Sequence, residues 1–341
     1  MEMNKKLITV VVPVYKVEQY IHKCLDSLIV PEEQLPLLEI LVVNDGTPDR
    51  SADMAREYEE RYPSVFRVID KENGGHGSAW NRGLLEARGK YIRFLDSDDW
   101  FTTSEFSRLI TQLQTLDVDV VLSHYNRYYI QDGRSVLHPM YREDIDQTFP
   151  IEEFHWDKLS WEQFNFWGCT YRTEMLRKEY PLFLEHIFYD DSILFIAPVL
   201  LARTIHVFDA VVYNYLIGRP GQTVAPGVKK RNLDSWKKSR FQIFDFTLSH
   251  MAEVHDAGRR DYLFDFLKKL LHYALVKFSE PSYRESKALS KEWIPYYDRC
   301  VEVFPALKDS SHSIRCYFRL PFPVYYVYRK ILSRIYPSEK K

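Results

Sequence analysis

The sequence predicts an α/β fold in which a doubly wound, mostly parallel sheet carries helices on both faces and is followed by a helical C-terminal region. Three observations support this prediction. Short β-branched runs alternate with helical patterns over residues 1–125, which is the pattern of βαβ units. Three of the first four runs lead directly into polar loops. Beyond Val228 the chain turns helical and more basic.

Strands and helices are expected to alternate along residues 1–125. The strands are expected at Leu7 to Val12, Glu39 to Asn44, Phe66 to Asp70, Tyr91 to Leu95 and Val118 to Ser123. The helices between them are expected near Val17 to Ser27, Ser51 to Arg61, Gly77 to Ala87 and Ser104 to Leu116. Three of these helices open at a serine or glycine, residue types that suit a helix start.

Composition and charge exclude several classes of protein. The 341 residues have an ordinary globular mix of apolar, aromatic and charged types, which excludes collagen-like and disordered chains. The formal net charge of -2 gives no electrostatic case for a nucleic-acid partner. The longest apolar run after the first strand, Ile193 to Ala202, is well short of the roughly 20 residues of a membrane span. No transmembrane helix is therefore predicted.

Two features indicate a cytoplasmic protein. The apolar stretch at the N-terminus is short and closes on Pro13, which is typical of a first strand and not of a signal peptide. The cysteines are scattered and have no C-x-x-C spacing, which favours reduced thiols over a disulfide framework or a zinc site. They are Cys24, Cys169, Cys300 and Cys316.

Polar loops follow the first four expected strands. In doubly wound sheets the ligand sits at the carboxyl ends of the strands, so these loops are expected to meet on one rim. They are Pro13-Val14-Tyr15, Asn44-Asp45-Gly46-Thr47, the segment Glu72 to Gly77, and Asp96-Ser97-Asp98-Asp99.

The last of these loops places three carboxylates, Asp96, Asp98 and Asp99, in one tight turn. Their mutual repulsion is costly unless a cation neutralises it. Mg²⁺ or Mn²⁺ prefers oxygen ligands and commonly binds carboxylates together with substrate phosphates. A turn that only caps the next helix is the structural alternative. Because other polar loops share the rim, the pattern favours a site for a metal and a diphosphate.

The glycine loop Gly74-Gly75-His76-Gly77 does not match a dinucleotide-binding fingerprint. Trp80 stands where a third glycine is expected, and the loop follows the third strand instead of the first. A Rossmann-type dehydrogenase is therefore not predicted. His76 suits a loop hydrogen bond as well as a catalytic role, and the sequence does not separate the two.

Four ordered motifs closely resemble the family 2 inverting glycosyltransferases, which have the GT-A fold. They are Thr9 to Tyr15 (TVVVPVY), Val42 to Asp49 (VVNDGTPD), Asn73 to Gly83 (NGGHGSAWNRG) and Tyr91 to Trp100 (YIRFLDSDDW). The resemblance continues more weakly through Phe166-Trp167-Gly168, Tyr189-Asp190-Asp191 and Val212 to Tyr215. It implies an enzyme of bacterial polysaccharide synthesis. Such an enzyme moves a sugar from a nucleotide-sugar donor, usually a UDP-sugar, to a saccharide or lipid-linked saccharide, with Mg²⁺ or Mn²⁺ as cofactor.

The resemblance also implies a division of the chain. Residues 1–226 would form the GT-A catalytic domain, with the nucleotide-binding part in 1–125 and the acceptor-side part in 126–226. Residues 227–341 would form the helical region with a basic amphipathic tail.

Residue by residue, the resemblance assigns the donor site. The nucleotide base would be held by Pro13, Val14, Tyr15 and Asp45, and the donor would be bracketed by Asn73, Gly74 and Asn81. Asp96 would lie toward the ribose or the metal, Asp98 would be the metal ligand, and Asp99 would support the donor sugar.

The chain departs from the family at Trp80, where the family has an arginine. Arg82 or Arg219 would then supply the contact to the diphosphate. Arg219 belongs to the segment Gly218 to Gln222, where related enzymes place a mobile loop over the donor and where glycines allow motion. A simple surface turn is the alternative.

Inverting transfer needs a base that removes the proton of the acceptor hydroxyl. In the family this base is the Asp of a Glu-Asp pair that opens a helix, which makes Asp191 the candidate and places Asp190 beside the donor sugar or the acceptor. The aspartate in place of the family glutamate leaves the register of the pair open by one residue. A carboxylate that only stabilises the helix dipole is the alternative. Trp167, within an aromatic segment from Trp156 to Tyr171, is the candidate for the acceptor wall.

The tail from Arg315 to Lys341 is basic and aromatic, with one acidic residue. If it is helical, an apolar face opposes basic residues, as in a helix that lies on an anionic membrane. That face would hold Val324, Val327, Tyr328, Ile331 and Ile335, with Arg329, Lys330 and Arg334 outside it. The enzyme would then be peripheral at the inner face of the plasma membrane. Packing of the same face on the catalytic domain is the alternative.

Two other functions compete. A sugar-nucleotide nucleotidyltransferase would need a glycine- and arginine-rich loop after the first strand, where this chain has Pro13-Val14-Tyr15. A non-catalytic nucleotide-sugar-binding module would be expected to lose site carboxylates, and Asp45, Asp96, Asp98 and Asp191 are all present. The sequence favours the glycosyltransferase and leaves the sugar, the acceptor and the oligomeric state open.

Overall fold

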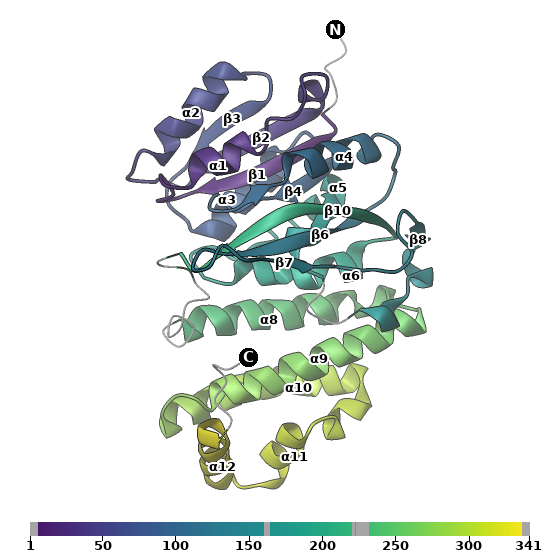
Figure 1. Cartoon of the computed structure of the whole chain (residues 1–341). Helices are drawn as coiled ribbons and strands as arrows, with labels where there is room; N and C mark the ends of the chain where they lie inside the picture. The colour runs from purple at the N-terminus through teal and green to yellow at the C-terminus, as the bar shows by residue number, and fades with distance from the viewer. Residues whose placement is uncertain (1–5, 160–163, 220–221, 223–231, 336–341) are drawn as a thin grey trace. The chain divides into compact units, whose positions relative to one another are not determined.

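The computed structural model describes residues 6–159, 164–219, 222 and 232–335. The chain forms two compact units, residues 1–222 and residues 223–341. The first unit is an α/β domain and the second is helical (Figure 1). The α/β fold class with a helical C-terminal region is therefore confirmed.

The N-terminal part of the sheet is parallel. Its strands are β1 (Ile8–Val14), β2 (Leu38–Asn44), β3 (Phe66–Asp70) and β4 (Tyr91–Phe94). They lie in the order β3-β2-β1-β4, and each neighbouring pair is parallel. β1 and β4 are buried along their whole length, because helices cover both faces of the sheet. These four strands agree with the predicted ones to within two residues at each end.

The remaining strands of the described chain make the rest of the sheet mixed. They are β5 (Trp100–Phe101), β6 (Val120–Tyr129), β7 (Ser135–His138), β8 (Thr148–Pro150), β9 (Cys169–Arg172) and β10 (Thr204–Ile217). β9 lies between β4 and β6 and is antiparallel to both. The fifth predicted strand therefore does not adjoin the fourth, because a later segment of the chain is inserted between them.

Helices cover both faces of this sheet, as Figure 1 shows. The α-helices of the first unit are α1 (Ile21–Asp26), α2 (Ser51–Arg61), α3 (His76–Glu86), α4 (Thr103–Leu113), α5 (Thr173–Arg177) and α6 (Ala197–Leu201). α1, α2 and α4 lie on one face, whereas α3 and α5 lie on the other. α3 packs closely on β1, because a Cβ atom on Gly83 would meet Val11 Cγ1 at 2.2 Å.

Short 3-10 helices connect these elements. They are η1 (Leu35–Leu37), η2 (Ile151–Glu153), η3 (Trp156–Lys158), η4 (Phe166–Gly168) and η5 (Asp190–Phe195) in the first unit, with η6 (Met251–Glu253) and η7 (Pro305–Asp309) in the second. η4 and η5 carry the residues that the sequence assigns to the acceptor and the base.

The second unit consists of α8 (Leu233–His250), α9 (Ala257–Phe278), α10 (Tyr283–Val303), α11 (His312–Arg319) and α12 (Phe322–Ile335). Its core contains fully buried side chains of α9 and α10, among them Leu267, Leu271 and Trp293. Ser282 and Glu285 form a capping box at the start of α10, which satisfies N–H groups that the helix itself leaves unpaired.

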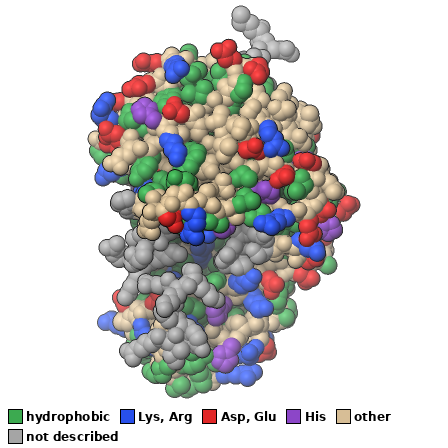
Figure 2. Space-filling view, viewed as in Figure 1, with side chains coloured by type: hydrophobic (Ala, Val, Ile, Leu, Met, Phe, Trp, Pro, Cys, Tyr) green, Lys and Arg blue, Asp and Glu red, His purple; other side chains and the backbone are tan. Residues whose placement is uncertain are grey.

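The face of the molecule shown in Figure 2 carries acidic and basic side chains interspersed among polar and apolar ones. All four cysteines are free, and three of them are buried. Within the described residues, no helix combines the length and the apolar character that crossing a bilayer requires.

Candidate active site

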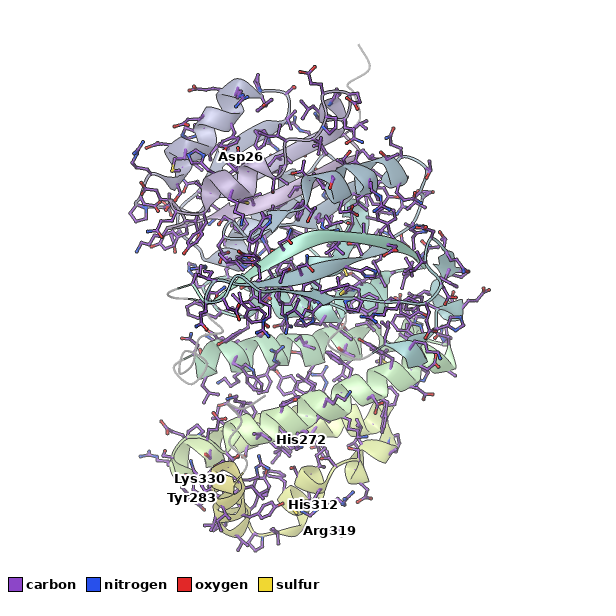
Figure 3. The ribbon with its side chains drawn as sticks, viewed as in Figure 1. Asp26, His272, Tyr283, His312, Arg319 and Lys330 are labelled. Atoms are coloured by element: carbon purple, nitrogen blue, oxygen red, sulfur yellow. The ribbon has the colours of Figure 1, made fainter. Side chains whose placement is uncertain are left out.

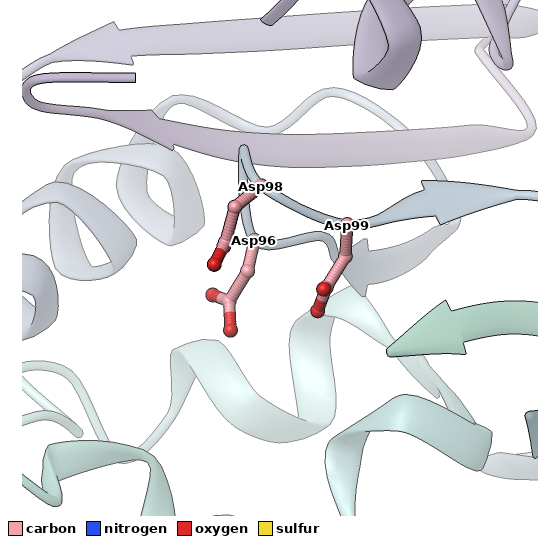
Figure 4. Close-up of side chains that lie close together, drawn as sticks. All are labelled: Asp96, Asp98 and Asp99. Carbon is pink, nitrogen blue, oxygen red and sulfur yellow. The ribbon is translucent and has the colours of Figure 1, made fainter. Parts of the chain in front are cut away.

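The acidic loop, residues 96–99, lies directly after β4. Its turn is closed by the Asp99 N–H, which donates to the Asp96 carbonyl oxygen at 2.9 Å. The side chains of Asp96, Asp98 and Asp99 project from this loop close to one another (Figure 4). One carboxylate oxygen from each lies within 4.8 Å of those of the other two. The structure therefore brings the three predicted carboxylates together.

Burial and mutual repulsion act on this cluster. Burial raises the pKa of Asp98, and the Asp96 charge raises it further, while the Arg219 guanidinium acts in the opposite direction. Burial raises the pKa of Asp99 well above its ordinary value, and its two acidic neighbours add to the rise. Both pKa shifts are the expected effect of burying neighbouring carboxylates, which a nearby cation would offset.

Each of the three carboxylates has a specific partner, and that of Asp96 is His76, whose Nε2 lies 2.9 Å from Asp96 Oδ1. Asp99 accepts hydrogen bonds from the Tyr213 hydroxyl at 2.6 Å and from the Leu216 N–H at 2.7 Å, so it anchors β10 to the acidic loop. Asp98 is paired with Arg219. A guanidinium thus lies where the sequence places a metal, which is consistent with a cation site at Asp98. The oxygen-only set of Asp96 and Asp98 fits a hard divalent ion.

His76, at the start of α3, bridges two distant carboxylates. Its Nδ1 lies 2.8 Å from Asp190 Oδ2, and its Nε2 lies 2.9 Å from Asp96 Oδ1. Ionised carboxylates only accept, so both ring nitrogens must carry protons and the ring is an imidazolium. Burial lowers the pKa of His76, but the two carboxylates outweigh it and raise this pKa well above its usual value. The bridge joins the acidic loop to η5.

The Trp80 ring packs against the His76 ring of this bridge. It is fully buried, and its ring centroid lies 4.2 Å from that of His76. Trp80 also packs on Phe94 of β4. Trp80, which departs from the family motif, therefore packs between His76 and the sheet residue Phe94.

The two residues of the acidic pair occupy different environments. Asp190 is buried, and its carboxylate bonds to His76 without capping η5. Asp191 is half-buried. The Asp191 charge, with those of the acidic loop, adds to the effect of burial in raising the pKa of Tyr215. Asp191 therefore lies near enough to Tyr215 for its charge to act on that hydroxyl.

Asp45 holds the glycine loop against the end of β2. Its Oδ1 accepts from Lys71 Nζ at 2.6 Å and from the Gly74 N–H at 2.9 Å, and its Oδ2 accepts from the Gly75 N–H at 2.8 Å. The Asn73 amide donates to the Asp45 carbonyl oxygen at 2.8 Å. The predicted nucleotide carboxylate is thus tied to two other residues of the predicted site, Asn73 and Gly74.

The end of β1, with Pro13 and Val14, and the following residue Tyr15 lie at the same rim as Asp45. Pro13 and Val14 are buried, whereas Tyr15 is exposed. The Asp45 N–H donates to the Val14 carbonyl oxygen at 3.0 Å. Only the Tyr15 side chain of this predicted trio is open to a ligand in the structure.

Asn81 and Arg82 lie away from the acidic loop. The buried Asn81 amide donates to the Phe183 carbonyl oxygen at 2.8 Å and accepts from the Phe183 N–H at 3.0 Å. Arg82 is exposed on α3 and pairs with Glu86 at 2.8 Å. Of the two arginines that the sequence offers for the diphosphate, the structure brings Arg219 to the acidic loop.

The aromatic segment from Trp156 to Tyr171 contributes some side chains to the hydrophobic core and one to the candidate site. Trp156 and Phe164 are buried and stacked on each other, and Trp161 lies outside the described residues. Trp167 is half-buried, and its ring stacks on that of Tyr215 with centroids 4.5 Å apart. Trp167 and Tyr215 therefore form an aromatic pair beside the carboxylates.

Comparison with known proteins agrees with this geometry. The model of glycosyl transferase family 2 matches residues 9–179. The chain belongs to glycosyl transferase family 2. This family 2 chain is 34% identical over 215 residues to EpsJ, an uncharacterized glycosyltransferase of Bacillus subtilis, which covers 61% of the chain and 60% of EpsJ. It is 36% identical over 102 residues to GgaB, a minor teichoic acid biosynthesis protein of the same species, which covers 30% of the chain and 11% of GgaB.

Among solved structures, S. aureus TarS 1-349 in complex with UDP-GlcNAc resembles the family 2 chain with a TM-score of 0.69. The likeness covers 96% of this chain and 92% of that chain at 21% identity. At this identity the likeness establishes the fold, which confirms the predicted GT-A architecture. The chain spans about three fifths of the length of EpsJ.

Sequence reasoning left three residues of this family 2 site unassigned. The sequence leaves the role of His76 open, gives none to Lys71, and includes Tyr213 only within the weaker resemblance over Val212 to Tyr215, yet all three contact predicted carboxylates. The signal for His76 is its place between the glycine loop and the start of a helix on the rim. The signal for Tyr213 is that weaker motif, whereas a single lysine such as Lys71 carries no such signal.

Proposed function

We propose that the chain is an inverting glycosyltransferase that uses a UDP-sugar and a saccharide or lipid-linked saccharide in the synthesis of a bacterial surface polysaccharide. The observation that carries this proposal is the bridge from Asp96 through His76 to Asp190, which brings the acidic loop and the acidic pair to one place. The compared proteins support it, since TarS binds UDP and UDP-GlcNAc and GgaB acts in teichoic acid synthesis. Family membership also favours sugar transfer over nucleotidyl transfer.

The donor nucleotide is assigned to residues 1–125 and the acceptor to residues 126–226. In this proposal Tyr15 flanks the base, while Pro13 and Val14 shape the pocket through the backbone. Asp45 has one further acceptor position for a base N–H, because an ionised carboxylate offers about four lone-pair sites and three are used. Asn73 and Gly74 hold that carboxylate in place, and Asn81 positions the loop at Phe183.

Asp98, with Asp96, would hold Mg²⁺ or Mn²⁺. When bound, such an ion neutralises developing charge on the leaving diphosphate. Arg219 is the diphosphate contact in this proposal, because it is the arginine beside the acidic loop and a diphosphate would offer it an anionic partner other than Asp98. Arg82 is the less suitable of the two arginines, because it pairs with Glu86 on the exposed face of α3.

The chemical step needs one base. We assign it to Asp191, which is more exposed than Asp190 and whose charge, like those of the acidic loop, acts on Tyr215. The acceptor oxygen forms a bond to the anomeric carbon, its proton passes to Asp191, and the bond from that carbon to the diphosphate breaks on the opposite side. Asp190 and His76 orient this segment, and Trp167 with Tyr215 forms the acceptor wall. Asp99 supports the donor sugar indirectly by fixing the loop.

A donor-hydrolysis assay tests the proposal. Purified protein is incubated with UDP-, GDP- and TDP-sugars and Mn²⁺ or Mg²⁺, and nucleotide release is compared between wild type, Asp98→Ala and the control Arg82→Gln. We expect release from a UDP-sugar that is abolished by chelation and by Asp98→Ala but retained in Arg82→Gln. Nucleotide binding by calorimetry without release from any donor would instead support a non-catalytic module, and absence of both binding and release would contradict the proposal.

The tail is assigned to the membrane in this proposal, at the cytoplasmic face. On α12 the apolar residues Val324, Val327 and Ile331 recur at i, i+3 and i+7 and are 52, 56 and 51% exposed. Helix packing within the second unit leaves this apolar stripe uncovered, as a helix that lies on a membrane requires. Replacement of all three residues by serine should abolish sedimentation with anionic vesicles. Unchanged sedimentation would contradict the assignment.

A further inference from the structure

A cavity of about 260 Å³ lies between α9 and α12 in the helical unit. Its walls include the side chains of His272 and Ser279 on one side and of Arg329 and Ser333 on the other. Figure 3 marks its position by His272 on α9 and by Lys330, the neighbour of Arg329, on α12. The α9–α12 pocket belongs to the second unit alone and shares no residue with the candidate active site.

Arg329 is the unusual residue of this pocket. It is 8% exposed, and no carboxylate among the described residues lies within ion-pair distance of it. Its hydrogen bond from Nη1 to Ser313 Oγ is long, at 3.5 Å, and its Nε has no partner within the described part of the chain. A guanidinium stays charged at any physiological pH, so burial without an anion is costly.

The other two arginines buried in the described chain have closer partners. Arg259, on the same helix as His272, pairs with Asp256 at 2.8 Å. Arg93 has no ion pair within the described residues and its Nε also lacks a partner there, but it donates at 2.7 Å both to Thr170 Oγ1 and to the Trp167 carbonyl oxygen. Arg329 alone of the three lines a cavity. The cavity beside this guanidinium leaves room for an anion.

The remaining groups around the pocket suit a small oxyanion. His272 Nδ1 is buried and without a partner among the described residues. Burial and the Arg329 charge lower the pKa of His272, so its ring is neutral and can donate one N–H. The Glu280 carboxylate is already neutralised by Lys277, whose Nζ lies 2.8 and 3.0 Å from its two oxygens. Lys330 adds a second cation beside the pocket, where its Nζ donates to the Glu280 carbonyl oxygen at 2.5 Å.

We propose that the α9–α12 pocket binds a phosphate group, with Arg329 as the charged ligand and His272, Ser279 and Ser333 as hydrogen-bonding groups. The exposed stripe of Val324, Val327 and Ile331 lies on the same helix as Arg329. A helix that rests on a membrane would bring lipid headgroup phosphates to this pocket. A free phosphate or a soluble phosphate ester has the same chemistry, and the experiment separates these sources.

The test compares full-length wild type with Arg329→Gln and with the control Arg319→Gln. Arg319 belongs to the same unit, but its side chain is 74% exposed. Inorganic phosphate is titrated by calorimetry against chloride at equal ionic strength, and sedimentation is measured with vesicles of phosphatidylglycerol and phosphatidylcholine. We expect saturable phosphate binding that Arg329→Gln weakens roughly tenfold or more, as loss of a charged hydrogen-bonding partner does, and that Arg319→Gln leaves unchanged.

The vesicle arm assigns the source. If Arg329→Gln sediments more weakly with vesicles while Arg319→Gln sediments like wild type, the ligand is a lipid headgroup. If Arg329→Gln loses phosphate binding but sediments like wild type, the ligand is a soluble phosphate. Absence of saturable binding to wild type in both arms, or an equal loss in both variants, overturns the proposal. Thermal unfolding without phosphate guards against misfolding, because a ligand-binding Arg329 should not lower the melting temperature when replaced, whereas a purely structural one should.

Discussion

The rim around the acidic loop and the α9–α12 pocket both contain buried charged side chains, but these side chains differ in how many partners they have. In the first unit Asp45 and Asp99 each accept at least two hydrogen bonds, and Asp190 is bonded to His76. In the second unit Arg329 has one long hydrogen bond and no ion pair within the described residues. The comparison teaches that the catalytic rim is pre-organised by its own side chains, whereas the helical pocket depends on a ligand to complete it.

The largest expected effect comes from the base. Asp191→Asn should lower kcat by roughly 10²- to 10⁴-fold, the usual contribution of a general base, because the amide cannot take the acceptor proton. Donor binding and the free energy of unfolding should change little, since Asp191 is only half-buried and asparagine has nearly the same size. Steady-state kinetics with donor and acceptor measure both constants. A larger loss in Asp190→Asn than in Asp191→Asn would shift the base by one residue.

Asp45→Ala should be the most destabilising change in the rim. It removes the acceptor for Lys71, Gly74 and Gly75 and leaves a largely buried ammonium without its anion. We expect a loss of roughly 3 kcal/mol in the free energy of unfolding, within the range for breaking a buried pair. Denaturant unfolding followed by fluorescence measures it. A loss below about 1 kcal/mol would mean that the glycine loop holds its conformation without Asp45.

His76→Ala should reduce kcat by about 10- to 100-fold with a smaller change in the donor KM, because it unlinks Asp190 from Asp96 while leaving both carboxylates in place. His76→Gln, which keeps one amide donor, should recover part of kcat. The measurement is kcat and KM for all three proteins. Equal activity of the alanine and wild-type enzymes would show that the bridge has no role in positioning.

Arg329→Met should have the smallest effect on stability, and its sign distinguishes the two regions. Removal of a buried guanidinium that has no ion pair should leave the melting temperature unchanged or raise it. A rise would correspond to a gain of about 1 kcal/mol in the free energy of unfolding. Arg259→Met should lower it, since Arg259 pairs with Asp256. Differential scanning calorimetry of the two variants makes the comparison. A lower melting temperature for Arg329→Met would show that Arg329 stabilises the folded protein without a ligand.

Much of the rim could be predicted from sequence because its residues follow strands directly. Asp45 and Asp96 lie at the ends of β2 and β4, and parallel strands bring their carboxyl ends to one edge. Pairings across long separations could not be predicted in this way. His76 and Asp190 are 114 residues apart, and only the path of the chain between them makes them neighbours.

The same distinction explains the two arginines. Arg82 lies close in sequence to the glycine loop, yet helical geometry turns it to the exposed face of α3. Arg219 is 121 residues from Asp98 and reaches it because β10 pairs with β5 beside the acidic loop. Proximity in sequence does not by itself bring a side chain on a helix to the acidic loop.

By itself the sequence determined the alternation of strands and helices, the acidic loop at the end of the fourth strand and the family. These features depend on local patterns: apolar runs, turn residues and carboxylates placed next to one another. Tertiary structure alone decided the insertion of β9, the histidine bridge and the uncompensated Arg329. Each of these depends on which distant segments pack together, and packing is settled by the burial of the whole chain rather than by any short stretch of it.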